Sequence, residues 1–283
     1  MTRPNDKDKI RDHYERVSPY YYSLWGEHLH HGYWIQGNET KEQAQIQLIE
    51  HLAQAANIAP QSRILDVGCG FGGSSIYLVK RYNAIATGIT ISPIQVEMAN
   101  QAAARQKVCA DFFLMDAEEM RFEERFDVVW SIESVSHYED VGRFFALAAN
   151  LLKPGGTIAI LDWFKEDDLS PKKYKSSLLP VEVGMLVQLH TIAEYESLLR
   201  LNGLNVVKRE VLNEHCAKTW DFCLDIIQDK ALWAIAATNG PEFVRFLRTF
   251  KAMRSAYASG HFLYGLLVAK ASNLAIIEGA DTQ

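Results

Sequence analysis

The sequence predicts an α/β fold: a Rossmann-like, seven-stranded, mostly parallel sheet with helices on both faces, plus an N-terminal helical lid and helical cap insertions. The first observation is the stretch 63–73, RILDVGCGFGG, where branched apolar residues suited to a buried strand run into a glycine-rich turn and a helix. The second is that apolar runs of strand length alternate with runs of helix length from residue 61 to residue 164. This order is typical of open sheets that bind ligands at the carboxyl ends of their strands.

The N-terminal half shows these elements most clearly. Residues 6–25 indicate a short helix followed by an aromatic cluster, and residues 39–57 a second helix. A strand is predicted over 84–91 and a helix over 93–105. The helix is expected to start at Pro93, because proline is favoured at a first helical position. The same signals predict further strands over 111–115, 126–131, 157–163 and 204–212, and helices over 140–152 and 192–201.

The last third is predicted to form a cap. Residues 165–180 are polar and contain prolines, which favours a loop or lid. Helical runs follow over 220–227 and 231–237, and residues 241–257 carry an apolar face that favours packing on the core, with a basic face that could otherwise meet a membrane or an anion. A strand over 260–270 completes the sheet, and the tail after Ala271 is predicted to fray.

These elements divide one compact domain into three parts. The expected parts are a lid segment over 1–60, a core over 61–164, 191–212 and 259–273, and substrate cap insertions over 165–190 and 213–258.

Two cofactor classes are open for the glycine turn. Gly68, Gly70 and Gly73 satisfy the G-x-G-x-x-G fingerprint of dinucleotide-binding folds. That fingerprint also requires an acidic residue about 20 positions later for the ribose, where this chain has Thr90. Asp66 instead places a carboxylate at the end of the strand, which suits the ammonium of S-adenosylmethionine better than a pyrophosphate. A nicotinamide oxidoreductase is therefore the alternative class.

Four motifs resemble those of class I S-adenosylmethionine-dependent methyltransferases. LHHGYW (29–34), DVGCGFGGSS (66–75), GITISPIQ (88–95) and WSIES (130–134) together resemble the tocopherol O-methyltransferase group, which borders the sterol C-methyltransferases and small natural-product methyltransferases. The resemblance extends over residues 10–270. It implies S-adenosylmethionine as methyl donor, S-adenosylhomocysteine as product, no metal, and a hydrophobic small molecule as acceptor.

The resemblance also implies roles for individual residues. The strand end and glycine turn hold the methionine part of the cofactor, a threonine and a glutamine replace the usual ribose-binding acid, an aspartate accepts the adenine amino group, and aromatic rings of the lid lie near the sulfonium. The expected cofactor-binding residues are Tyr22, Tyr33, Asp66, Gly68, Cys69, Gly70, Gly72, Thr90, Ile91, Gln95, Asp116, Ala117, Ile132 and Glu133. Asp116 can alternatively cap the turn that follows it, and the two tyrosines can instead pack the lid onto the core.

His137 is the predicted catalytic residue. It stands four positions after Glu133, where the helix after the fourth strand is expected to begin. A histidine can take a proton from a phenol or an amine near neutral pH. The run ESVSHYED resembles ESLHHMPD of natural-product methyltransferases and ESGEHMPD of tocopherol-type enzymes, and it keeps the second histidine of the former pair. The alternative is a helix-capping or core histidine.

Aromatic residues outside the glycine turn predict a hydrophobic substrate pocket for a ring-bearing or prenylated acceptor. The candidates are His31, Trp163, Phe164, Trp220 and Phe222. A phenolic oxygen is the first choice of acceptor atom, a carbon of an isoprenoid or arene the second, and nitrogen the third. A methyltransferase fold that serves as a scaffold or rearrangement catalyst without methyl transfer is a further alternative.

Composition narrows the class of protein. The chain has 283 residues, of which 48% are hydrophobic and 23% charged, as in globular proteins, and its net charge of -6 argues against general nucleic-acid binding. No apolar run reaches the ~20 residues of a membrane span, and the polar, acid-containing N-terminus resembles neither a signal nor a transit peptide. The four cysteines form no C-x-x-C pair, which predicts reduced thiols, no metal site and a cytoplasmic location. A homo-oligomer is left open.

Overall fold

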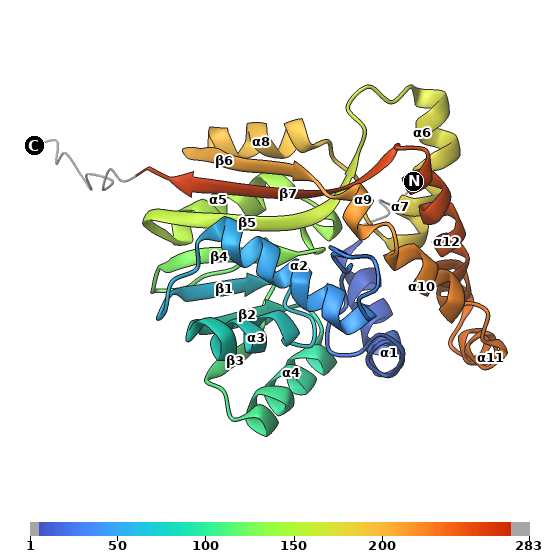
Figure 1. The fold of residues 1–283 in the computed structure, drawn as a ribbon, viewed down its shortest axis with the longest axis horizontal. Helices are drawn as coiled ribbons and strands as arrows, with labels where there is room; N and C mark the ends of the chain where they lie inside the picture. The colour runs from blue at the N-terminus through green and yellow to red at the C-terminus, as the bar shows by residue number, and fades with distance from the viewer. Residues whose placement is uncertain (1–5, 273–283) are drawn as a thin grey trace, which may run out of the picture.

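A seven-stranded sheet organises the computed structural model, which describes residues 6–272 (Figure 1). The strand order is β3-β2-β1-β4-β5-β7-β6, with β7 antiparallel to both of its neighbours and the other pairs parallel. The strands are β1 Arg63–Val67, β2 Ile85–Thr90, β3 Ala110–Leu114, β4 Phe126–Ile132, β5 Leu152–Lys165, β6 Leu204–Val211 and β7 Phe262–Ala271. The predicted fold class is confirmed.

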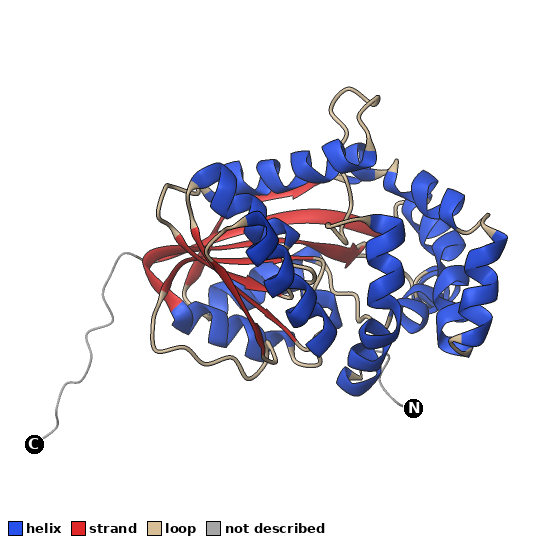
Figure 2. Cartoon of the chain, turned by 90° about the horizontal axis from the view of Figure 1, so that it is seen from below, coloured by secondary structure: helices blue, strands red, loops and turns tan. Residues whose placement is uncertain are grey.

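Helices cover both faces of this sheet, and a further group lies beyond one end of it (Figure 2). The helices are α1 Lys7–Trp25, α2 Lys41–Ala56, α3 Gly73–Tyr82, α4 Pro93–Gln106, α5 Val141–Leu151, α6 Pro171–Ser177, α7 Leu179–Met185, α8 Ile192–Leu201, α9 Asn213–Cys216, α10 Thr219–Ile226, α11 Lys230–Thr238 and α12 Pro241–Ala258, with a 3-10 helix, η1, over Val135–His137. The group at the end consists of α1, α6, α7 and α9 to α12 (Figure 1).

Side-chain alternation along the strands divides the core into two layers. Trp130 of β4 and Leu161 of β5 pack with Leu48 of α2 on one face. Their neighbours in sequence, Val129 and Ile160, pack with α5 and α8 on the other face. Successive side chains of a strand point to opposite faces, so each buried strand serves both layers.

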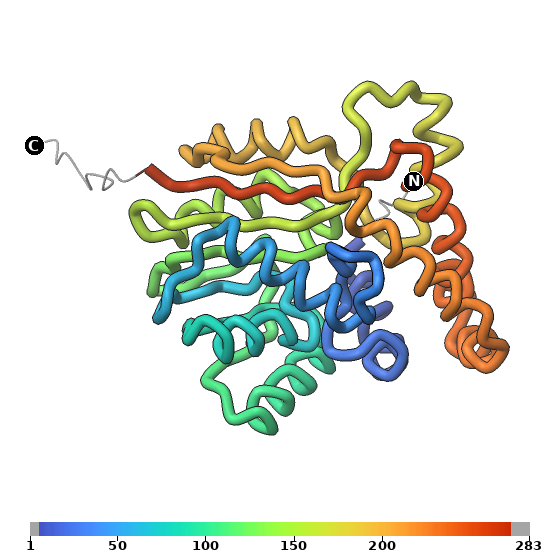
Figure 3. The backbone as a smooth tube through the Cα atoms, in the orientation of Figure 1, coloured from blue at the N-terminus to red at the C-terminus, as the bar shows by residue number. Residues whose placement is uncertain are grey.

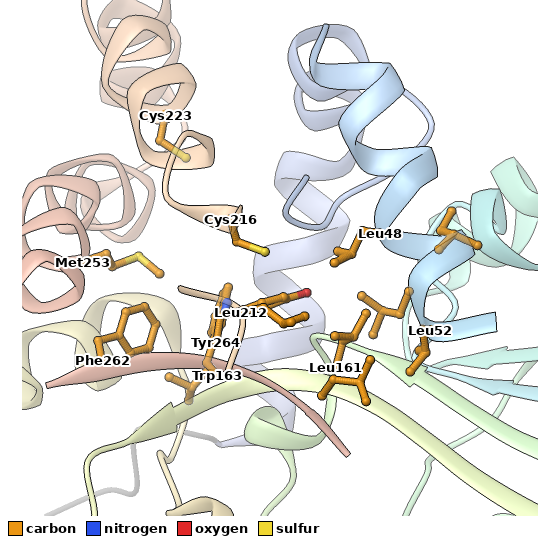
Figure 4. Close-up of a cluster of buried hydrophobic side chains, with 14 of the residues drawn as sticks. Leu48, Leu52, Leu161, Trp163, Leu212, Cys216, Cys223, Met253, Phe262 and Tyr264 are labelled. Atoms are coloured by element: carbon orange, nitrogen blue, oxygen red, sulfur yellow. The ribbon is translucent and has the colours of Figure 1, made fainter. Parts of the chain in front are cut away.

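The face that carries α2 continues into the cap. Trp163 and Tyr264, from β5 and β7, lie beside Cys216, Cys223 and Met253 of the cap helices (Figure 4). The apolar side of α12 is buried here while Arg245, Arg248 and Lys251 are exposed, as the core-packing interpretation of residues 241–257 expects. The cap is thus continuous with the core and is not a separate globule.

Two elements differ from the predictions. Residues 165–180 do not form a plain loop, because Ser170 caps α6 and Pro171 occupies its first helical position, so this proline opens a helix. The N-terminal helix is not short: α1 runs unbroken through the aromatic cluster to Trp25, with Pro19 inside it. In Figure 3, α1 lies next to α12 although they are far apart in sequence. Residues 273–283, where a frayed tail was predicted, lie outside the described residues.

Candidate active site

The glycine turn after β1 brings the chain close to the end of β4. Gly68 has a φ of +79°, and a Cβ built there would lie 2.3 Å from Cβ of Ser134. Gly72 also has a positive φ, and its Cβ would meet the ring of Phe112 at 2.6 Å. Both positions therefore require glycine, and the backbone of the turn stays open to a ligand.

A first cavity of about 1020 Å³, counted with its mouth, lies at the carboxyl ends of β1, β2 and β4. Most of the expected cofactor-binding residues line it: Asp66, Gly68, Cys69, Gly70, Thr90, Ile91, Gln95, Asp116, Ala117, Ile132 and Glu133. Gly72 lies just behind this lining as the N-cap of α3. The first cavity lies at the edge of the sheet where ligands bind in this class of fold.

Asp66 is a buried carboxyl in the wall of the first cavity. Its Oδ2 accepts a hydrogen bond from Oγ of Ser75 at 2.7 Å. Burial raises the pKa of Asp66 to about 7, although the hydrogen bonds from Ser75 favour the ionised form. A cation placed in the cavity would offset this desolvation, so the site fits the ammonium of a ligand.

The adjoining walls carry two polar clusters. Oγ1 of Thr90 donates to Oε1 of Gln95 at 2.7 Å, and both side chains are buried. Asp116 is paired with Lys7 of α1 at 2.7 Å, and the same ammonium lies 3.0 Å from Glu118. The lid helix is therefore tied across the cavity by an ion pair to the predicted adenine-binding residue.

A second cavity, about 640 Å³ with its mouth, lies between the sheet and the cap. Its walls are mainly aromatic and apolar, among them Tyr21, Trp25, Trp163, Met185, Trp220, Cys223, Phe246, Phe250 and Met253. Five residues line both cavities: Tyr14, Leu29, His30, Glu133 and His137. The two cavities thus meet around His137, where a group held in one can reach a molecule held in the other.

His137 is held in a defined tautomer at this junction. Its Nδ1 lies 3.0 Å from the carbonyl oxygen of Leu186, which can only accept, so Nδ1 carries the hydrogen. Nε2 is left as an acceptor, 3.4 Å from the hydroxyl of Tyr14. Desolvation lowers the pKa of His137 to about 4, so the ring is neutral at pH 7. The residue belongs to η1, where a helix start was expected.

Glu133 is buried beside this junction with a φ of +54°, a sparsely populated backbone conformation for a residue with a side chain. Its Oε1 accepts from the backbone N–H of His31 at 2.7 Å and from the hydroxyl of Tyr264 at 2.8 Å, and lies 3.0 Å from Nδ1 of His31. Burial alone would raise the pKa of Glu133, but His31 outweighs burial and holds it below its usual range. If this carboxylate also binds the cofactor, it does so while it holds His31 of the lid segment.

Besides Gly72, four expected residues lie outside both cavities. Tyr22 packs edge-on against Phe71. Tyr33 lies between His51 and His215, with ring centroids 4.6 and 4.5 Å away, which corresponds to the packing alternative.

The other two are candidates for the substrate pocket. Phe164 points to the opposite face of the sheet and packs on Tyr195, and Phe222 stacks on Trp34. His31, Trp163 and Trp220, in contrast, line the second cavity as expected.

The sequence analysis missed the residues that α1 contributes. Ile10 lines the first cavity, Tyr14 both, and Tyr21 the second. Their spacing of four and seven residues places them on one face of a helix. This spacing could have revealed the face, but the predicted helix ended before the aromatic cluster that contains Tyr21.

The family model of mycolic acid cyclopropane synthetases matches residues 2–262. The 27-O-demethylrifamycin SV methyltransferase of Amycolatopsis mediterranei (strain S699) is 31% identical over 268 residues, covering 93% of this chain and 97% of the relative. The chloroplastic tocopherol O-methyltransferase of Arabidopsis thaliana is 28% identical over 282 residues, covering 91% of this chain and 80% of the relative. A crystal structure of the mycolic acid cyclopropane synthase CmaA1 with SAH and CTAB has a TM-score of 0.83 at 21% identity, covering 94% and 98% of the two chains.

The fold, the glycine turn and these similarities define a class I S-adenosylmethionine-dependent methyltransferase, near the tocopherol O-methyltransferase group. More narrowly, the chain belongs to the mycolic acid cyclopropane synthetase family. Within residues 6–272, no group of three or more His, Cys, Asp or Glu side chains is arranged to hold a metal ion. None of the helices in that range combines the length and apolarity needed to cross a membrane.

Proposed function

We propose that this enzyme methylates the hydroxyl oxygen of a hydrophobic small molecule, most simply a phenol that carries a ring system or a prenyl chain. The observation that carries the proposal is the meeting of an aromatic-walled cavity with the first cavity at His137. The Arabidopsis relative is named an O-methyltransferase, and the Amycolatopsis relative acts, by name, on an O-demethyl compound. Both names support oxygen as the acceptor atom.

The walls of the second cavity favour a neutral acceptor. Among the described residues that line it, none is Lys or Arg, so a prenyl diphosphate would find no cation there to balance its charge. Trp163 and Trp220 offer flat apolar surfaces for a ring or an isoprenoid chain. The cap insertions, over 165–190 and 213–258, supply Met185, Cys223 and the α12 side chains to this wall.

The side chains have distinct roles in this proposal. S-adenosylmethionine supplies an electrophilic methyl group to the junction of the cavities. Asp66 binds its ammonium, Thr90 and Gln95 face the ribose, and Asp116 the adenine. His137, neutral and with Nε2 as its acceptor nitrogen, orients the acceptor hydroxyl or takes its proton. The aromatic walls exclude water from the junction.

Methylation of an isoprenoid or aromatic carbon is the second candidate. The observation that favours it is the aromatic wall, because Trp and Phe rings stabilise a nearby cation by about 0.5–2 kcal/mol. A carbon acceptor would pass through such a cation and then lose a proton.

The test is a labelled-methyl transfer assay with a mixture of 2-prenylphenol, a prenylhydroquinone, geranyl diphosphate and an aromatic amine, read by mass spectrometry. Label on a phenolic oxygen supports the proposal. Label on carbon or nitrogen overturns the choice of oxygen. The Asp66→Asn variant, which should bind the cofactor more weakly, should transfer less label when the cofactor is limiting. Binding of S-adenosylhomocysteine with no label on any acceptor contradicts the proposed acceptor class.

A further inference from the structure

His31 is placed like a catalytic base, although the motif around it marks only a cavity wall. Its Nδ1 lies 3.0 Å from Oε1 of Glu133, an ionised carboxylate that can only accept, so Nδ1 carries a hydrogen. Its Nε2 is buried without a hydrogen-bond partner among the described residues. The imidazole lines the second cavity, and Nε2 is the ring nitrogen that the described residues leave unpaired.

The position of this imidazole is fixed on several sides. The backbone N–H of His31 bonds to the same Oε1 of Glu133, at 2.7 Å. The ring stacks on Tyr264 with centroids 4.4 Å apart and meets the edge of Trp220 at 4.9 Å. Glu133 is held in turn by the hydroxyl of Tyr264 and by its own N–H, which donates to the carbonyl of Leu161 at 2.7 Å. Such support fixes both tautomer and direction.

His31 differs from the other two histidines of the second cavity in having a carboxylate as its hydrogen-bond partner. Nδ1 of His30 lies 2.8 Å from the carbonyl of His31, and Nδ1 of His137 lies 3.0 Å from the carbonyl of Leu186. A carbonyl fixes the tautomer but does not neutralise an imidazolium. Glu133 does both for His31, which is the arrangement that makes a histidine an effective proton acceptor.

The remaining neighbours leave Glu133 as the charged group beside His31. Within residues 6–272, the other titratable side chains with a ring contact or an electrostatic interaction with His31 are Tyr264 from β7, Tyr257 from α12 and the adjacent His30. Burial raises the pKa of both tyrosines well above the usual value and lowers the pKa of His30, so all three are neutral near pH 7.

We propose that His31 is the catalytic base of methyl transfer, with Glu133 as its positioning and charge-balancing residue and His137 as the group that orients the acceptor. The proposal rests on the proposed hydroxyl acceptor. The acceptor oxygen forms a bond to the methyl carbon as the carbon–sulfur bond breaks and its electron pair stays on sulfur. The hydroxyl proton passes to Nε2 of His31, and Glu133 balances the imidazolium. Neutral ether and neutral thioether leave.

The first test needs no acceptor. Nitrogen-15 NMR of histidine-labelled protein with S-adenosylhomocysteine should show His31 with hydrogen on Nδ1 and a bare Nε2 at alkaline pH. In Glu133→Gln the signal of the Nδ1 hydrogen should move upfield, because its hydrogen bond to a carboxylate becomes one to a neutral amide. Hydrogen on Nε2 in the alkaline form, or a signal of the Nδ1 hydrogen unchanged by Glu133→Gln, would overturn the proposal even if the acceptor is unknown.

The second test uses the phenol identified in the transfer assay. His31→Asn keeps an amide N–H toward Glu133 but has no base, so it should lower kcat about a hundredfold with S-adenosylhomocysteine affinity unchanged. The loss should shrink for phenols acidic enough to be ionised already, whereas a structural defect would penalise all phenols alike. His190→Asn, at a histidine 3.5 Å from Glu194 and outside both cavities, is the matched control and should turn over normally. An equal loss for every phenol would overturn the assignment.

Discussion

Asp66 shows how burial prepares one carboxyl for a cationic ligand. Its pKa of about 7 means that the free protein holds this group partly protonated at neutral pH. Ammonium binding requires the ionised form, so binding and deprotonation are linked. The same shift has the opposite sign for stability. Because the pKa of Asp66 is higher in the folded protein than in the unfolded chain, the stability that this group contributes is fully present below pH 3.8, the unfolded value. That stability is lost as the pH rises through the folded pKa of about 7.

We therefore expect S-adenosylhomocysteine to bind the enzyme about tenfold more tightly at pH 8 than at pH 6, because the ionised fraction of Asp66 rises across that range. Asp66→Asn should weaken binding about ten- to a hundredfold and remove most of this pH dependence, since an amide cannot balance the ammonium. Calorimetric titrations at several pH values measure both effects. A parent enzyme with pH-independent affinity would show that another group holds the ammonium.

Asp162 anchors the segment that carries His137. Its carboxyl accepts from the backbone N–H and the hydroxyl of Ser136, at 2.8 and 2.9 Å, and so holds η1 in place. It also accepts from the hydroxyl of Tyr195 at 3.3 Å. His137 is the next residue after Ser136, so its ring depends on this anchor.

We expect Asp162→Ala to lower kcat by roughly tenfold or more through misplacement of His137, and to destabilise the fold by about 1–3 kcal/mol, because buried donors lose their acceptor. Affinity for S-adenosylhomocysteine should change little. Asp162→Asn keeps one acceptor oxygen and should recover part of the rate. Steady-state kinetics and denaturant unfolding separate the two effects, and a normal rate in the alanine variant would show that η1 needs no such anchor.

At the scale of elements, α1 acts as a strap over the first cavity. Lys7 near its start pairs with Asp116 and Glu118. Eight residues further along α1, Glu15 accepts from Oγ of Ser92 at 2.5 Å and from the N–H of Ile94 at 3.1 Å. These anchors join the helix to segments that follow β2 and β3, so a ligand in the cavity lies beneath α1.

We expect Lys7→Ala to speed the dissociation of S-adenosylhomocysteine severalfold, because one anchor of the strap is lost, and to do so less at high salt, where the parent pair is already screened. Lys9→Ala is the matched control, since Lys9 lies on the same helix but pairs with Asp6. Stopped-flow displacement gives the rate. Equal rates for both variants would mean that α1 opens independently of this ion pair.

Much of the molecule could be predicted from the sequence because its signals are local. The glycine turn and the alternation of strand and helix patterns placed the sheet, and the residues after β1, β2 and β4 reached one cavity as expected. Side-chain direction was harder. Trp163 and Phe164 were both placed in the pocket, but neighbours on a strand point to opposite faces, so only one could be there.

The lid resisted prediction for a different reason. Tyr33 follows a His-His-Gly run in an irregular segment, where no period fixes direction, and its packing between His51 and His215 depends on contacts distant in sequence. The dyad of His31 and Glu133 likewise joins residues 102 positions apart, so only the folded chain brings it together.

The molecule as a whole combines a cofactor-binding sheet with a cap that shapes the second cavity, and these two functions should be separable. Cys223 on α10 lines the second cavity and is not among the residues that line the first. Cys223→Phe would fill part of the cavity, and we expect it to raise KM for bulky phenols about tenfold at a cost of about 1–3 kcal/mol in stability from overpacking. Cys223→Ala would enlarge the cavity and should favour longer prenyl chains.

Both variants should bind S-adenosylhomocysteine like the parent, because the wall of the first cavity is untouched. Kinetics with a series of phenols of increasing chain length, together with calorimetry for the cofactor product, measure the two properties on the same proteins. If the Phe and Ala variants shift the preferred chain length in opposite directions, the cap determines acceptor size. If neither variant alters the preference, the acceptor does not occupy the second cavity, and the chemistry must be sought at the mouth of the first.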